Sequence, residues 1–261
     1  MQLKIAIGQM DIVLGDRAAN LGAVRQLAAR AELEGAGLLV LPELWGSGYD
    51  LERGVELSDA PGQGLFAETA RLAATHHLAI CGSLLERRDG GVYNTAVLYD
   101  DEGQPRSSYS KTHLIGLMAE DRFLVRGDSA PTVQMPWGVT AQAICYDLRF
   151  PELFRRYGLA GARLVLLPAE WPDRRIEHWR TLLKARAIEN QCFVVACNRV
   201  GSVRDNTFGG CSAAIDPWGK VLVEGGEQPG LFTATLDFAE VDEVRRFLPV
   251  FRDRRPDVYE G

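Results

Sequence analysis

Cys145 is well placed to act as a nucleophile, because it directly follows the apolar, strand-like run 139–144. Pro151 then predicts the start of a helix. A thiol on a sharp strand-to-helix turn is held by stiff backbone, and we expect it to face outward. A helix N-terminus favours negative charge and lowers the pKa of a thiol toward the reactive thiolate. The alternative is a small buried core residue, which is the usual environment of a free cysteine.

Two further residues with useful chemistry come where apolar runs end. Glu43 closes the segment LLVLPE, where a carboxylate is costly to bury alone, so we expect it at an opening or beside a cation, acting as a general base. Lys111, in YSKTHL, could stabilise a developing oxyanion, as could the backbone amide of Tyr146. Taken singly, a solvated loop acid and a surface lysine are the simpler interpretations. Glu120 follows in LMAEDRF and indicates little by itself.

The elements that must position these residues alternate between helices and strands, which predicts an α/β fold. Some segments have apolar residues at helical spacing, and others are short apolar or alternating runs typical of strands. No linker-like stretch interrupts the series, so we expect residues 1–261 to form a single domain. The expected helices are 20–34, 64–76, 151–159, 177–190 and 240–247. The expected strands are 4–10, 38–41, 78–85, 94–99, 106–109, 133–142 with a turn at 136–138, 164–167, 192–197, 210–215, 220–223 and 231–236.

One sequence pattern occurs twice. Residues 35–43 read GAGLLVLPE and residues 161–170 read GARLVLLPAE, and each follows an expected helix. Each copy is a glycine turn, an apolar strand, a proline and an acid. The chain therefore holds either two structurally similar halves or two strand–helix units that resemble each other by chance.

The composition argues against several classes of protein. With 46% hydrophobic and 25% charged residues, the chain can bury a sizeable core. A net charge of −6 without a basic block weighs against a nucleic-acid partner, and we expect no membrane span or signal peptide. Five cysteines do not suggest a disulfide framework, so we expect a reducing cytoplasm. The sequence has no CxxC motif, and its histidines do not have the spacing of metal ligands, so we expect no metal site.

The segments around the candidate residues resemble motifs of the nitrilase superfamily of carbon–nitrogen hydrolases. They read LPELWGSGY at residues 41–49, YSKTHL at 109–114 and ICYDLRFPE at 144–152, in the family's order and at its separations. The tail motif RRPDVYE also resembles the family's C-terminus, so the resemblance covers nearly the whole chain.

This resemblance implies a catalytic Glu-Lys-Cys triad of Glu43, Lys111 and Cys145, with Glu120 as the family's second glutamate. It also implies a four-layer α-β-β-α sandwich with two related halves. Members of the family pair as homodimers through a helical face, and we expect the tail 248–261 to contribute dimer contacts.

Within the superfamily, the segment AEWPDRRIEHW and the following segment KARAIENQCFVVACN are most similar to the omega-amidase branch. That branch hydrolyses the terminal amide of 2-oxoglutaramate and 2-oxosuccinamate, small 2-oxo dicarboxylate monoamides. Two alternatives stay open. The same thiolate chemistry could act on a nitrile, a simple aliphatic amide or a carbamoyl compound. A non-catalytic binding protein could also keep this fold.

The expected mechanism follows from the weak electrophilicity of an amide. Glu43 would take the proton from Cys145, whose thiolate attacks the carbonyl while Lys111 and the Tyr146 backbone amide hold the oxyanion. Glu43 would then protonate the departing ammonia and later deprotonate the water that hydrolyses the thioester. Glu120 would orient Lys111 or the substrate amide. This chemistry requires no metal or cofactor.

The expected substrate pocket is formed by aromatic and cationic side chains. Tyr49 and Trp171 could wall a small pocket, although large aromatics more often fill a core. A dicarboxylate-like substrate needs a cation, for which Arg174 and Arg175 are the candidates. Arg149 is a further candidate, but we expect it to have a structural role beside an acid or a backbone carbonyl.

Overall fold

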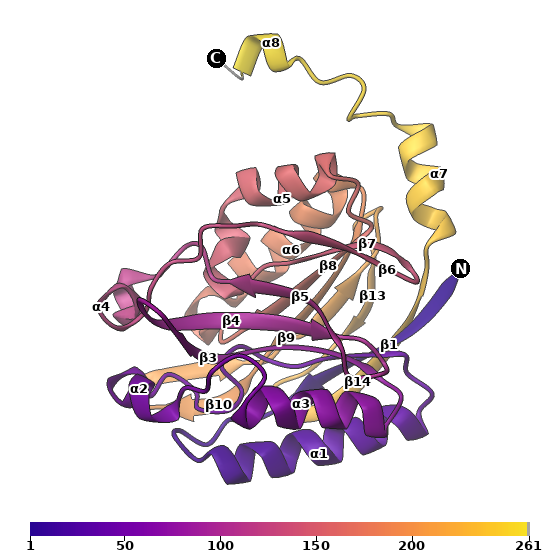
Figure 1. The fold of residues 1–261 in the computed structure, drawn as a ribbon. Coiled ribbons are helices and arrows are strands. Elements are labelled where there is room, and N and C mark those ends of the chain that lie inside the picture. Colours follow the sequence, from indigo (N-terminus) through magenta and orange to yellow (C-terminus); the bar gives the residue numbers. More distant parts are fainter. Residues whose placement is uncertain (260–261) are drawn as a thin grey trace.

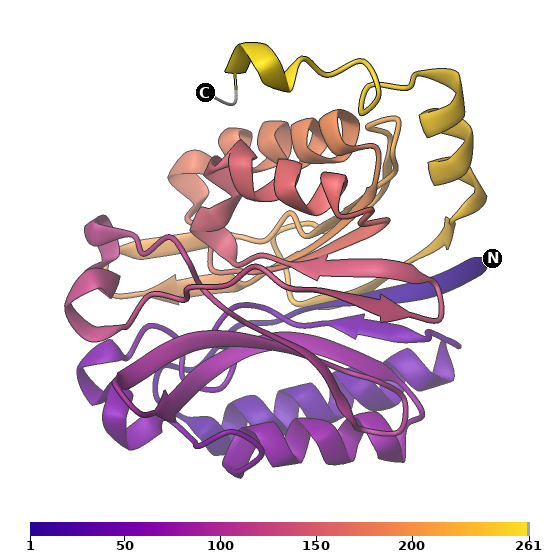
Figure 2. The same cartoon turned by 45° about the horizontal axis from the view of Figure 1, so that its top comes forward.

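The structure, a computed structural model, describes residues 1–259, and its two six-stranded sheets lie face to face between two pairs of helices (Figures 1 and 2). Helices α1 (Arg17–Leu33) and α3 (Gly64–Thr75) cover one sheet. Helices α5 (Pro151–Leu159) and α6 (Ile176–Asn190) cover the other. The expected four-layer α-β-β-α sandwich is therefore confirmed.

The two sheets share one plan, with parallel strands at the centre and antiparallel strands outside. In the first sheet β1, β2 and β3 run parallel, and in the second β7, β8 and β9 do. The order in the first sheet is β14 (Gly230–Asp237), β1 (Gln2–Gln9), β2 (Leu38–Val40), β3 (Ala79–Arg88), β4 (Gly91–Tyr99), β5 (Pro105–Ser110). The order in the second sheet is β13 (Val221–Glu224), β12 (Ala213–Ile215), β9 (Phe193–Asn198), β8 (Leu164–Ala169), β7 (Gly138–Gln142), β6 (Thr132–Met135).

Three apolar layers hold these elements together, one between the sheets and one under each helix pair. Along β1, Ile5 and Ile7 point into the layer between the sheets, where Leu166 and Phe193 come from the opposite side. Ala6 points the other way, into the layer beneath α1 and α3. This alternation follows from the two-residue period of a strand, and burial of both faces is what stabilises such a sandwich.

The repeated sequence pattern corresponds to equivalent positions in the fold. Strands β2 and β8 are each the middle member of a parallel trio, and they lie opposite each other across the sandwich. At their carboxyl ends the two segments meet, with the Glu43 N–H 3.4 Å from the Ala169 carbonyl oxygen. The carboxyl edge of parallel strands is where α/β proteins place their sites.

Several short elements were not predicted. They are the hairpin β10 (Val200–Val203) and β11 (Asn206–Gly209) and the helices α2 (Gly54–Leu57) and α4 (Glu120–Phe123). Each has four residues, too few to show a period in the sequence. Among the residues that the structure describes, no helix has the length and apolarity needed to cross a bilayer.

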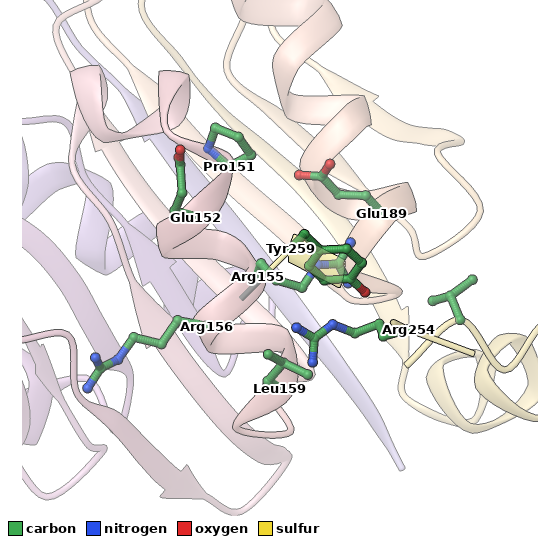
Figure 3. A pocket seen from close by; sticks show the side chains of 9 residues that line it. Pro151, Glu152, Arg155, Arg156, Leu159, Glu189, Arg254 and Tyr259 are labelled. Carbon is green, nitrogen blue, oxygen red and sulfur yellow. The ribbon is translucent and has the colours of Figure 1, made fainter. Parts of the chain in front are cut away.

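The C-terminal segment leaves the sandwich and runs over the outer helices. After α7 (Ala239–Phe247) the chain extends past α5 to α8 (Pro256–Tyr259) (Figure 1). The tail was expected to have no regular structure, and the helix α8 differs from that expectation. Residues 260–261 of the expected tail lie outside the described residues. A cavity of about 610 Å³ opens between the tail, α5 and α6 (Figure 3), lined by Pro151, Glu152, Arg155, Arg156, Leu159, Glu189, Val250, Arg254 and Tyr259.

Candidate active site

A buried ammonium between two buried carboxylates forms the centre of the site. Lys111 Nζ donates to Glu43 Oε1 at 2.7 Å and to Glu120 Oε1 at 2.5 Å, and all three side chains are inaccessible to solvent. Burial by itself would lower the pKa of Lys111, but the charges of Glu120 and Glu43 outweigh it and raise the pKa well above its usual value. Lys111 is therefore a permanent cation.

The carboxylates are fixed by further donors. Asn94 Nδ2 donates to Glu43 Oε1 at 2.8 Å, and the backbone N–H of Glu170 donates to Glu43 Oε2 at 2.9 Å. The hydroxyl of Tyr49 lies 2.6 Å from Glu120 Oε1 and 3.1 Å from Glu43 Oε1. Burial raises the pKa of Glu120, and the neighbouring Lys111 ammonium offsets part of that rise. These contacts leave each carboxylate a single orientation.

Cys145 occupies a strained turn beside this cluster. It follows β7 after two residues and begins the single helical turn Cys145–Arg149, with a positive φ of 45°. Left-handed backbone is unfavourable for a residue with a side chain and persists only where surrounding contacts enforce it. The thiol Sγ lies 3.8 Å from the Glu170 carbonyl oxygen. The expectation that Cys145 faces outward is wrong, since only 4% of its surface is exposed.

The pKa of Cys145 moves in the direction opposite to that expected from a helix N-terminus. Burial and the adjacent Glu43 carboxylate raise the pKa of the thiol well above its usual value, and only Lys111 opposes them. One short helical turn cannot outweigh this burial. The resting cysteine is therefore a thiol, and the Glu43 carboxylate is its neighbour.

Asp147 joins the Cys145 turn to the segment that carries Lys111. Its Oδ2 accepts from the Ile144 N–H at 2.9 Å and from the Tyr109 hydroxyl at 2.7 Å. Its Oδ1 accepts from the His113 N–H at 3.1 Å and lies 2.7 Å from His113 Nδ1. Tyr109 and His113 stand two residues before and after Lys111. One buried carboxylate thus sets the position of the nucleophile relative to the cation.

A narrow cavity opens beside the thiol and brings together several of the predicted pocket residues. Its lining residues are Ile115, Met118, Cys145, Tyr146, Arg149, Trp171, Pro172 and Arg175. Arg174 is exposed and does not line this cavity. Tyr49 is not part of the lining, because its hydroxyl belongs to the hydrogen-bonded cluster.

Arg149 lies in the cavity rather than beside an acid. Its guanidinium carbon is 4.7 Å from the centre of the Trp171 ring, and its terminal nitrogens are 3.4 Å from His178 Nδ1. Burial, followed by the charge of Arg175, lowers the pKa of Arg149. Within the described chain its hydrogen bonds go to His178 and to neither Glu152 nor a backbone carbonyl, so the expected structural pairing is wrong.

Four residues with roles in this geometry were not predicted: Asn94, Asp147, Glu170 and Arg199, whose guanidinium donates to the Glu170 carboxylate at 3.0 Å. Asp147 stands within a motif already singled out, but its contacts are distant in sequence. Glu170 was detectable, because it ends the second copy of the repeated pattern just as Glu43 ends the first.

Comparison with known proteins is consistent with this geometry. Residues 4–246 match the family described as carbon-nitrogen hydrolase. The 2-oxoglutaramate amidase of Bacillus subtilis (strain 168) is 43% identical over 99% of this chain and 100% of its own. The deaminated glutathione amidase of Homo sapiens is 35% identical over 94% of this chain and 80% of its own.

A solved structure shows the same similarity in three dimensions. A CN-hydrolase superfamily protein from Xanthomonas campestris, described with an arsenic adduct in its active site, has a TM-score of 0.92 and 31% identity. The match covers 98% of this chain and 98% of that chain.

The contacts of Asp147 predict that Asp147→Asn destabilises the fold. Both oxygens of the Asp147 carboxylate accept hydrogen bonds. In asparagine one of them is replaced by an NH₂ group, which cannot accept, so a buried N–H or hydroxyl loses its partner. We expect the free energy of unfolding to fall by about 1–3 kcal/mol, measured by denaturant titration. Asp101→Asn, in an exposed turn, is the matched control. Equal stability of the two variants would contradict the assigned contacts.

Proposed function

The chain belongs to the carbon-nitrogen hydrolase family of the nitrilase superfamily, and from this premise we propose that it is an omega-amidase. Its substrate is a small 2-oxo dicarboxylate monoamide, 2-oxoglutaramate or 2-oxosuccinamate, which it hydrolyses to the acid and ammonia. The observation that carries this proposal is a narrow cavity lined by the Cys145 thiol and two arginines, with the buried acid–lysine cluster next to that thiol. The 43% identity to a 2-oxoglutaramate amidase supports the choice of substrate.

In the proposed mechanism, Cys145 is the nucleophile and Glu43 the general base. Glu43 takes the thiol proton and sulfur attacks the amide carbonyl, while the Lys111 ammonium and the Tyr146 N–H stabilise the oxyanion. Protonated Glu43 gives its proton to the nitrogen, and the C–N bond breaks to release ammonia. A thioester remains on Cys145.

Water then completes the cycle. Glu43 deprotonates the water, the hydroxide attacks the thioester, and the thiol leaves with the proton returned to it. Glu120 acts on Lys111 by holding its ammonium in a fixed direction, in line with the 2.5 Å contact between them. This chemistry calls for no metal or cofactor.

The carboxylate of the substrate is proposed to bind Arg175 and Arg149. Both line the cavity that contains Cys145, and neither has a carboxylate partner within the described chain. A guanidinium fork matches a carboxylate with two parallel hydrogen bonds. Trp171 supports this proposal by packing under Arg149, and Tyr49 contributes indirectly through the carboxylate cluster.

We further propose a homodimer of single-domain subunits spanning residues 1–261, with contacts from the helical face and the tail 248–261. An apolar patch formed by Ile188, Trp218, Phe247 and Leu248 supports it, because each of these side chains is about half exposed or more and the Trp218 and Phe247 rings lie 5.8 Å apart, with Ile188 beside Gly219. Clustered exposed apolar side chains are typical of association surfaces. Five free thiols support a cytoplasmic location, and the charge of −6 supports a small-molecule substrate rather than a nucleic acid.

The mechanism predicts that Cys145→Ala abolishes ammonia release from 2-oxoglutaramate and that Glu43→Gln lowers kcat by about 10²–10⁴-fold, since the thiol keeps its proton. Glu227→Gln, an exposed acid, is the matched control and should retain the rate of the parent. The same assay on simple aliphatic amides, nitriles and deaminated glutathione tests the substrate. Turnover of 2-oxoglutaramate far below any of these would show the substrate to be wrong.

The arginine assignment predicts a rise in KM. Arg175→Lys and Arg149→Lys keep a charge but lose the fork, so we expect KM for 2-oxoglutaramate to rise about tenfold with a smaller effect on kcat. Arg174→Lys is the control, since Arg174 is exposed and outside the cavity. Steady-state kinetics measure all three. If only Arg174→Lys raises KM, the carboxylate is held on the outer loop instead.

The dimer proposal predicts that Phe247→Glu lowers the mass in solution toward that of one chain. Phe247 is 75% exposed, and a buried charge without a partner would disrupt an apolar interface. Leu33→Glu is the control, because Leu33 is 85% exposed at the end of α1, on the opposite helical layer. Light scattering after size exclusion gives the masses. A parent protein that elutes as a monomer would refute the proposal.

A further inference from the structure

Glu170 is a buried acid that the mechanism above does not use. It directly follows β8, as Glu43 follows β2 in the first copy of the repeated pattern, and it is inaccessible to solvent. An ionisable side chain in such a position needs a physical reason, because burying a carboxylate is costly unless it is paired. Its contacts supply that reason.

The backbone of Glu170 touches both reacting groups of the site. Its N–H donates to Glu43 Oε2 at 2.9 Å, and its carbonyl oxygen lies 3.8 Å from Cys145 Sγ. The next peptide is clamped by Asn198, whose side chain accepts from the Trp171 N–H at 2.7 Å and donates to the Trp171 carbonyl at 3.1 Å. A shift of this backbone would therefore move the base relative to the nucleophile.

The side chain of Glu170 anchors that backbone to Arg199. Arg199 Nη1 donates to Glu170 Oε2 at 3.0 Å, and Arg199 is itself fully buried. Its Nη2 donates to Asp11 Oδ1 and to the Ile12 carbonyl, both at 2.8 Å. The guanidinium also lies 4.7 Å from the centre of the Phe208 ring. Held at so many points, Arg199 is a rigid anchor.

Positive charge is scarce around these acids. Lys111 is shared by Glu43 and Glu120, and Arg199 is shared by Glu170 and Asp11. Glu170 Oε1 has no hydrogen-bond partner within the described chain. A buried carboxyl with one donor and an acid beside it favours its neutral form. Burial is the largest cause that raises the pKa of Glu170, to about 8, with Arg199 opposing and Glu43 adding to it.

We infer that Glu170 is a positioning residue, anchored by Arg199, that holds Glu43 and Cys145 in register and whose negative charge, when present, slows the reaction. This inference rests on the proposed function, since it concerns the same thiol and base. Near neutral pH the carboxyl holds its proton on Oε1, because Oε2 accepts from Arg199. As the pH rises, its ionisation adds a negative charge behind a thiol that must itself become negative.

The charged and titratable groups around Glu170 set the size of this effect. Arg199 faces it from the end of β9, Glu43 and Tyr49 from the segment after β2, and Lys111 from the segment after β5. Among these, only Arg199 contacts the Glu170 carboxyl directly in the described chain. Replacement of Glu170 therefore changes one charge without removing a contact to Lys111.

The charge is tested with Glu170→Gln, which keeps the shape of a neutral acid. With a pKa of about 8, the neutral fraction of Glu170 falls about tenfold between pH 7 and pH 9. We expect the ratio of kcat/KM at pH 9 to that at pH 7 to be about three- to tenfold higher in Glu170→Gln than in the parent. Glu227→Gln should show the parent's ratio. An unchanged ratio in Glu170→Gln would overturn the role of the charge.

The positioning role is tested with Glu170→Ala, which releases the backbone from Arg199. We expect kcat to fall about 10- to 100-fold with KM within about twofold, since misalignment affects the reacting atoms more than binding. An unchanged kcat would overturn the inference. A rise in KM alone would also overturn it, because it would place Glu170 in substrate binding. If the alanine variant does not fold, the pH ratio of Glu170→Gln still decides whether the Glu170 charge slows the reaction.

Failure of the inference can be told apart from failure of the proposed function. If the parent does not hydrolyse 2-oxoglutaramate, the proposed substrate is wrong. The rate at which iodoacetamide alkylates Cys145, followed by mass spectrometry of its peptide, needs no substrate. Glu170→Ala should lower that rate about tenfold at pH 7, because Glu43 no longer faces the thiol. Equal alkylation rates would overturn the positioning role by themselves.

Discussion

The burial of Lys111 between Glu43 and Glu120 is the constraint on which the rest of the structure depends. Each charge taken out of water costs several kcal/mol, and the cost is offset only when partners and further donors surround it. Removing Lys111 would leave two carboxylates in the interior without their shared cation. Segments that are far apart in sequence must therefore converge, and their convergence puts a carboxylate and a cation next to Cys145.

The sandwich meets this constraint through its two similar halves. Facing β2 and β8 bring two strand ends together at one edge, so an acid and a rigid backbone segment arrive from opposite sheets. Asp147 fixes the Cys145 turn by holding it against the residues on either side of Lys111. The strained backbone at Cys145 persists because these contacts over-determine it. Burial and the neighbouring Glu43 carboxylate favour the protonated form of this thiol.

The sequence was sufficient for the parts of this arrangement that depend on local patterns. Apolar runs located the long strands and helices, and the acid, lysine and cysteine at their ends indicated the centre once their motifs were compared with those of the nitrilase superfamily. Contacts between distant segments were not predictable, and Asp147 is an example, because its partners Tyr109 and His113 lie more than thirty residues away. The depth at which Cys145 is buried could not be predicted from the sequence either, so the predicted lowering of its pKa was wrong. Arg174 and Arg175 are neighbours with identical side chains, and only the fold separates the exposed one from the one in the cavity.

The most direct test of the cysteine mechanism is to look for the covalent intermediate. The parent protein is mixed with 2-oxoglutaramate, quenched in acid during turnover and digested, and the peptides are weighed by mass spectrometry. A thioester on Cys145 adds the mass of the acyl group to that peptide, and we predict this adduct during turnover and its disappearance once substrate is exhausted. Ammonia release at the parent's rate from Cys145→Ala, or an acyl group on another residue, would contradict the mechanism.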